Sequence, residues 1–461
     1  MAEDFTGFAV DKSNPFLVVV QCLYMVADEA AIKAAAGSKG ASGLRPCLRC
    51  NAVYGQQTNL RGFPSISEDD YRRFVIQSDQ DVKDTMTFLQ QHADRPTRLK
   101  EKLSGWHLVP ESFVMDATCK KFLQPSRVQY DAMHIYFSNG IVGQELGLIF
   151  SAAMDAGLNQ EALGNFLALP WAAPQSKKIA AFQLRELAKL LKRGSDFKGD
   201  ASQTLHMLPL MAFFSSEVLS GIEALSLQCA SLEKLNLVCL QIQASKQNAK
   251  AANGLSDAQR SHFQAFKAAY ASEAARPKHH YAFHLEAQVA ASACMLDCFT
   301  CERKNKKFIS IAENIVKLQD FEKSVLLRWL EADAEQCLRL TEDMPDHEVL
   351  SSPSALLPPD VLGEHVTISK CMYCPWGTIS AGDFFLEGQD AAYKILACML
   401  RDGSGEVLAL QHDRLLSRGP EMSWSKWSNG NRAVLIPVEI VMHMAAVSFA
   451  CADDGQIYLL R

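Results

Sequence analysis

The chain has 461 residues, a formal net charge of −6 and a hydrophobic fraction of 48%. This length is too great for one small core, so we expect two or three domains. The composition is typical of a globular protein. The acidic balance excludes a chain coated all over with basic nucleic-acid-binding surface, although a local basic groove remains compatible with it.

The first residues predict no secretion signal, because MAEDFTGFAVDK starts acidic and has no basic segment before an apolar core. The longest apolar run, 16–27, is interrupted by Gln21 and is too short to cross a bilayer. We therefore expect an intracellular protein without a membrane partner. In a reducing compartment its 14 cysteines should be buried free thiols or metal ligands.

The first third of the chain mixes strands, helices and turns. PFLVVVQCLYMVA, residues 15–27, predicts a buried strand that is bounded by Pro15 and Asp28. DEAAIKAAAGSKG predicts a short helix with acidic residues in its first turn and a glycine stop. A turn-rich loop follows, then polar helices over 67–93 and 98–104, and a short extended piece that leads into an amphipathic helix.

The remainder of the chain divides into a helical part and a strand-rich part. From about 158 to 345, Leu, Ala and Phe recur at three- and four-residue spacing, which predicts helices. A proline-rich linker over 346–365 separates them from short alternating runs that predict a small β-domain over 366–461. The expected fold class is therefore α+β and mostly helical.

Asp28 is the first candidate for chemistry, because it ends the predicted buried strand. Enzymes that cut phosphodiesters with two divalent cations place carboxylates in this way, since Mg²⁺ prefers hard oxygen ligands. The alternative is that Asp28 and Glu29 only cap the helix that follows them.

A Cys-x-x-Cys pair, Cys47 and Cys50, supplies half of a tetrahedral zinc site. RPKHHYAFHLEA offers the other half, since either His280 or His279 can pair with His284 to present two imidazoles to one ion. The alternatives are incidental thiols and an exposed polar helix face.

Two further groups of residues carry side chains that can bind metal ions or phosphate. Asp131 and His134 lie three apart, so they share a face and could support a metal-bound carboxylate or form a local hydrogen bond. Glu302 opens a basic segment with Arg303 and Lys304, which fits a metal ligand beside phosphate contacts, or a solvated charged helix.

The order of these motifs resembles the DDE transposases of eukaryotic cut-and-paste DNA transposons, with closest similarity to CACTA-type and Transib-type elements and the related antigen-receptor recombinase. The resemblance covers roughly residues 15–310. It implies a partial RNase H-like core with the Cys-x-x-Cys loop over 1–150 and a helical insertion with the catalytic-glutamate region over 151–345. The linker 346–365 and the β-domain 366–461 would follow.

The resemblance also implies roles for individual residues. Asp28 would be the second catalytic acid and Glu302 the third, with Mg²⁺ or Mn²⁺ as the catalytic ion. Asp131 and His134 match an Asp-x-x-His element of the family. A structural Zn²⁺ would be bound by Cys47, Cys50, His279 and His284, with His280 as the alternative to His279.

One departure from the family pattern concerns the first catalytic aspartate. Only 27 residues precede Asp28, too few for the three strands that should come first. We therefore expect an N-terminally truncated, inactive or domesticated transposase-like protein in the nucleus, with DNA as a partner and a homodimer as its assembly. The alternative is a non-catalytic, zinc-stabilised nuclear module that binds DNA or protein.

Overall fold

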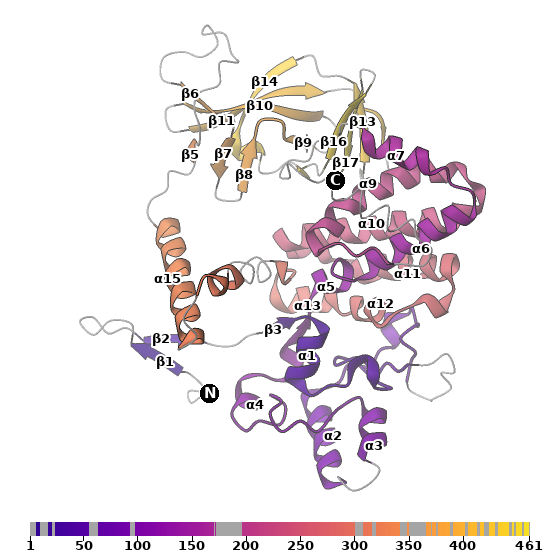
Figure 1. Cartoon of the computed structure of the whole chain (residues 1–461), viewed down its shortest axis with the longest axis vertical. Helices are drawn as coiled ribbons and strands as arrows, with labels where there is room; N and C mark the ends of the chain where they lie inside the picture. The colour runs from indigo at the N-terminus through magenta and orange to yellow at the C-terminus, as the bar shows by residue number, and fades with distance from the viewer. Residues whose placement is uncertain are drawn as a thin grey trace. The chain divides into compact units, whose positions relative to one another are not determined.

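The computed structural model has helices and several small sheets, which confirms the α+β class (Figure 1). The structure describes residues 6–9, 17–20, 24–54, 63–92, 97–169, 171, 196–299, 308–315, 320–341, 348–349, 366–369, 371–374, 377–387, 391–401, 404–412, 415–418, 424–428, 432–441, 445–446, 449–453 and 456–460. No helix in these ranges is both long enough and apolar enough to span a membrane.

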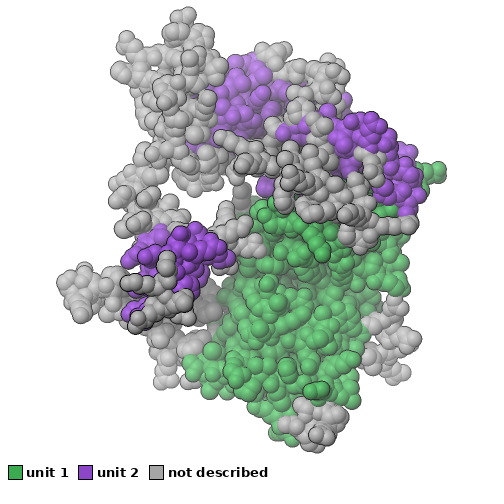
Figure 2. Space-filling view, viewed as in Figure 1, with its two compact units in different colours: residues 1–152, 193–204, 223–299 green, residues 153–192, 205–222, 300–461 purple. Residues whose placement is uncertain are grey.

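Two compact units divide the chain (Figure 2). Unit 1 comprises residues 1–152, 193–204 and 223–299, and unit 2 comprises 153–192, 205–222 and 300–461. Unit 1 thus joins the segment predicted to be the first domain to much of the predicted helical segment. The two halves of the predicted metal site therefore lie in the same unit.

The first described elements of unit 1 are short strands. β1 (Thr6–Ala9) pairs with β2 (Leu17–Val20) in an antiparallel ladder, and β3 (Met25–Ala27) pairs with β4 (Val128–Tyr130) in a parallel one. The described parts of the strand predicted over 15–27 include β2 and β3, and β3 is half-buried rather than buried. Because the β3–β4 pair is parallel, the residues after both strands lie at the same edge.

The helix that follows β3 has both of its ends capped. The side chain of Asp28 accepts a hydrogen bond from the Ala31 backbone N–H at the start of α1 (Glu29–Ala36). Gly37 ends the helix in the left-handed region at φ 75°, where an added Cβ would lie 2.9 Å from the His107 carbonyl oxygen. The loop that carries the cysteines therefore leaves α1 through a left-handed backbone conformation that favours glycine.

Helices make up the rest of unit 1, and α10 and α11 pack against each other. Its core is aromatic and aliphatic, with Tyr136, Phe150, Phe263 and Phe266 fully buried. The helices are α2 (Asp79–Gln91), α3 (Thr97–Ser104), α4 (Cys119–Phe122), α5 (Ala132–Tyr136), α6 (Ile141–Asp155), α10 (Ser226–Gln247), α11 (Leu255–Tyr270), α12 (Pro277–Ala282) and α13 (Leu285–Ser292), with α6 and α9 (Ala201–Glu217) extending into unit 2.

Unit 2 contains further helices and the predicted β-domain. Phe166 of α7 (Gln160–Ala168) packs on Phe214 of α9, with ring centroids 5.1 Å apart, and α15 (Phe321–Thr341) follows later. The strands are β5 (Glu348–Val349), β6 (Val366–Ser369), β7 (Cys371–Cys374), β8 (Gly377–Ser380), β9 (Phe384–Glu387), β10 (Ala391–Arg401), β11 (Ser404–His412), β12 (Leu415–Arg418), β13 (Trp424–Ser428), β14 (Arg432–Pro437), β15 (Ala445–Ala446), β16 (Phe449–Asp453) and β17 (Gln456–Leu460), with a short helix, α16 (Val438–Val441).

All pairings among these strands are antiparallel. One sheet runs in the order β14-β11-β10-β9-β15, with β6 also on β10, a second runs β12-β13-β17-β16, and a third runs β5-β7-β8. Alternating side chains of β9 contribute to two cores: Phe385 packs with Ile395 and Val407, whereas Leu386 packs with Trp427. This alternation is the period-two pattern on which the β-domain was predicted.

The backbone of β4 is tied to α13 by one amide side chain. The Tyr130 N–H donates to Gln288 Oε1 at 3.0 Å, and Gln288 Nε2 donates to the Tyr130 carbonyl oxygen at 3.0 Å. Substitution of Gln288 by Met would leave both buried backbone groups without these partners. We therefore expect Gln288→Met to lower the free energy of unfolding by about 2–4 kcal/mol, measured by chemical denaturation.

Gln90→Met is the control, because Gln90 is an exposed residue of α2. It should change the unfolding free energy by no more than about 0.5 kcal/mol. Equal losses in the two variants would contradict a structural role for the Gln288 amide.

Asp383 predicts a pH dependence in the β-domain. It is 5% exposed, and its Oδ2 accepts from the Ser380 N–H at 2.8 Å. Burial raises the pKa of this carboxyl to about 6, while the Ser380 hydrogen bond opposes the change. The folded chain therefore holds more protons than the unfolded chain between pH of about 4 and about 6, so stability decreases as pH rises through that window.

Asp383→Asn keeps the acceptor and removes the charge. Hydrogen exchange in peptides covering residues 377–401 should be slower in the variant than in the wild type at pH 6.5 and nearly equal at pH 4.5. The same difference at both pH values would show that ionisation of Asp383 is not the cause.

Candidate metal centre

The thiols of Cys47 and Cys50 are held by a loop whose backbone is fixed on both sides. The Gln77 side-chain amide donates to the Cys50 carbonyl oxygen at 2.7 Å, and Cys50 forms an isolated bridge with Ile76. The Arg49 N–H donates to Cys47 Sγ at 3.3 Å. Both cysteines are buried, so the loop turns its two sulfur atoms inward.

The imidazoles come from the junction of α12 and α13. Pro277 starts α12, and His284 is the residue that precedes α13. His280 and His284 are four positions apart, one helical turn, so their rings can reach the same point. Figure 1 shows α12 against α5, the helix that follows β4.

The structure brings these four side chains together. Cys47 Sγ lies 3.2 Å from His284 Nε2, and Cys50 Sγ lies 3.1 Å from His280 Nε2. The ligand atoms of Cys47, Cys50, His280 and His284 all lie within 4.8 Å of one another, and every one of the four residues is buried.

Two thiols and two imidazoles at this separation form a group that could bind a metal ion such as zinc. Tetrahedral zinc separates sulfur and nitrogen ligand atoms by about 3.6 Å, so the pairs would open by roughly half an ångström around the ion. Two thiolates would neutralise the charge of Zn²⁺, so the site needs no further charged side chain.

The surroundings of the cluster favour a thiolate at Cys47. Burial alone would raise the pKa of the Cys47 thiol, but the hydrogen bond from Cys50 and the neighbouring His284 and His280 hold that pKa well below its usual value. Burial and the hydrogen bond to Cys47 raise the pKa of Cys50. Burial also lowers the pKa of His280, which keeps its imidazole neutral and able to bind metal.

Two tyrosines support the cysteine loop, and the sequence analysis did not identify them. Tyr130 OH accepts from the Leu48 N–H at 3.0 Å and approaches Cys47 Sγ at 3.5 Å. Tyr281 OH approaches the Pro46 carbonyl oxygen at 3.1 Å, and its ring stacks on Tyr130 with centroids 4.5 Å apart. Each tyrosine is adjacent in sequence to a predicted site residue, Asp131 or His280, and that adjacency is the one available signal.

His279 lies outside the cluster, so the implied pair His279 and His284 is corrected to His280 and His284. The His279 ring packs against Phe266, with centroids 4.5 Å apart, and its Nδ1 accepts from the Arg276 N–H at 3.2 Å. Burial and the nearby His262 lower the pKa of His279 to about 3, so it is a neutral core residue. Consecutive residues of a helix point about 100° apart, and only one of the two can face the thiols.

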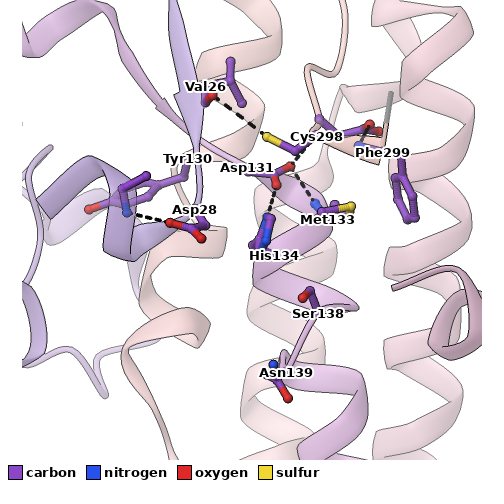
Figure 3. Close-up of polar contacts among 12 residues, drawn as sticks. Val26, Asp28, Tyr130, Asp131, Met133, His134, Ser138, Asn139, Cys298 and Phe299 are labelled. Atoms are coloured by element: carbon purple, nitrogen blue, oxygen red, sulfur yellow. Dashed lines mark hydrogen bonds and ion pairs between the residues drawn. The ribbon is translucent and has the colours of Figure 1, made fainter. Parts of the chain in front are cut away.

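The predicted carboxylates take up local structural positions (Figure 3). Asp28 Oδ1 accepts from the Ala31 N–H at 2.6 Å, which is the helix-capping alternative. Asp131 caps α5 through the Met133 N–H, and its other oxygen contacts His134 Nδ1. Asp28 and Asp131 directly follow the parallel strands β3 and β4, so the two share one sheet edge.

Three predicted site residues, Glu302, Arg303 and Lys304, lie outside the described residues. Among the residues that the structure does describe, Asp28 is in no group of three potential metal ligands. The described carboxylates therefore do not assemble a magnesium or manganese site around Asp28.

No family model, curated protein or solved structure matches the chain. Its chemistry is therefore assigned from the buried cysteine–histidine cluster and from the positions of the carboxylates alone.

The two adjacent histidines give a direct test of the cluster. We expect His280→Asn to lose one equivalent of bound metal per chain, because a ligand is removed, and His279→Asn to retain it. Metal content after dialysis can be measured by plasma mass spectrometry, with circular dichroism to check the fold. Loss of metal from His279→Asn alone would contradict the assignment.

Proposed function

We propose that this chain is a transposon-derived, DDE-transposase-like protein with a structural zinc ion bound by Cys47, Cys50, His280 and His284. The observation that carries the proposal is the burial of two thiols against two imidazoles that are separated from them by 230 and 237 positions. A closed site with four protein ligands is typical of structural zinc, which contributes folding energy and leaves no position for substrate.

The arrangement around Asp28 supports a descent from an RNase H-like nuclease core. Asp28 directly follows a strand that pairs in parallel with β4, and the cysteine loop begins after the next helix. Carboxylates at one edge of a parallel pair are suited to DNA cleavage with two metal ions. The partner proposed for this core is DNA, its location the nucleus and its assembly a homodimer.

The activity that we propose for the present chain is absent or feeble. Asp28 Oδ1 caps a helix, and Asp131 Oδ1 accepts two backbone hydrogen bonds. A carboxylate oxygen that is already bound in this way must give up a hydrogen bond to coordinate a cation.

The same contacts favour a second candidate, a non-catalytic zinc-stabilised module that binds DNA or protein. In this alternative the strand-end carboxylates have only structural roles. DNA binding without any cleavage would favour it.

A nicking assay on supercoiled DNA with Mn²⁺ or Mg²⁺ separates the two candidates. Asp28→Asn is the informative variant, because asparagine caps a helix as well as aspartate and differs in charge. We expect trace nicking in the wild type and none in Asp28→Asn, while Asp84→Ala, on the exposed face of α2, behaves like the wild type.

Nicking that persists unchanged in Asp28→Asn would contradict a role for this carboxylate. Robust nicking that depends on Asp28 would contradict the proposed loss of activity. Salt-dependent DNA binding with no nicking in any variant would support the binding module.

A further inference from the structure

A second cluster of ligand-type side chains lies at the ends of β3 and β4 (Figure 3). It consists of Asp131, His134 and Cys298, whose ligand atoms all lie within 4.8 Å of one another. Asp131 is 2% exposed and Cys298 is 8% exposed, so the carboxylate and the thiol are shielded from solvent. Asp131 caps α5, His134 lies within α5, and Cys298 lies in the segment that follows α13.

The carboxylate of Asp131 is fixed in a way that leaves one oxygen directed at the cluster. Oδ1 accepts from the Met133 N–H and from the Cys298 N–H, each at 3.0 Å. Oδ2 faces His134 Nδ1. Cys298 therefore holds the carboxylate with its backbone and places its own thiol beside it, and hydrogen bonds of this kind orient ligands at metal sites.

The geometry points to a second transition-metal site in which Asp131 Oδ2, His134 Nδ1 and Cys298 Sγ bind one zinc-class ion. Three protein ligands leave the fourth tetrahedral position to water or an added ligand, as in open zinc sites. Thiolate and imidazole ligands select zinc or cobalt over Mg²⁺. The inference does not depend on descent from a transposase.

The competing interpretation is an Asp131–His134 pair with Cys298 as an ordinary core thiol. Cys298 Sγ lies 3.9 Å from the Val26 carbonyl oxygen, which is a long and weak contact. A core thiol of this kind would tolerate serine without any change in metal content. Metal stoichiometry therefore separates the two interpretations.

The test measures zinc per full-length chain by plasma mass spectrometry after dialysis against metal-free buffer. We expect two equivalents in the wild type and one in Cys298→Ser and His134→Gln. Cys294→Ser is the matched control, because Cys294 is four residues earlier and outside the cluster, and it should keep two. The His134 side chain is 22% exposed, so His134→Gln is expected to fold even where the cysteine variant does not.

Cobalt substitution assigns each equivalent to its site. Cys298→Ser should remove the smaller share of the sulfur-to-cobalt absorption, since it removes one thiolate, and Cys50→Ser should remove the larger share. The three-ligand ion should also be the first to be lost to a chelator.

One equivalent in the wild type, or two retained in both Cys298→Ser and His134→Gln, would overturn the inference. Failure of the proposed transposase-like function would show as absent nicking and absent DNA binding, and it would not change the metal bound by Asp131, His134 and Cys298. The two failures are therefore distinguishable.

Discussion

Two buried thiols face two buried imidazoles in unit 1 and connect segments more than two hundred positions apart. Without a cation the pair cannot ionise fully, because burial opposes a second thiolate beside the first. A divalent ion removes this conflict and turns four polar side chains into one neutral cluster. Since the cysteines lie more than two hundred positions from the histidines, ion binding would also close a long loop, and its binding free energy would become folding free energy.

The elements that hold this cluster also build the strand ends beside it. Tyr130 contacts Cys47, and the next residue, Asp131, belongs to the second cluster. Their backbone is fixed by Gln288, which is one helical turn beyond His284 and donates its N–H to the His284 carbonyl oxygen at 3.1 Å. A change in the position of α13 would therefore move His284 and the end of β4 together.

Sequence reasoning predicted the features that depend on local chemistry. The capped helix after Asp28, the glycine stop at Gly37 and the alternating strands of the β-domain follow from residue type and period, and the structure has them. The sequence could not separate His279 from His280, because either spacing to His284 suits a metal site. The packing of Phe266 against His279 is what places His279 outside the cluster. The position of Cys298 beside Asp131 arises from tertiary folding, which no spacing rule along the sequence predicts.

The charges at the strand ends decide which cation this edge can accept. Lys278 Nζ donates to the carbonyl oxygens of His134, Ser138 and Asn139, at 2.6, 3.0 and 2.9 Å. Burial lowers the pKa of Lys278, while the nearby Glu29, Asp131 and Asp28 act in the opposite direction. A fixed ammonium group thus already compensates part of the carboxylate charge on which Mg²⁺ would depend. An ion bound through a thiolate and an imidazole needs less of that charge, so the same edge that disfavours a magnesium centre remains able to bind zinc.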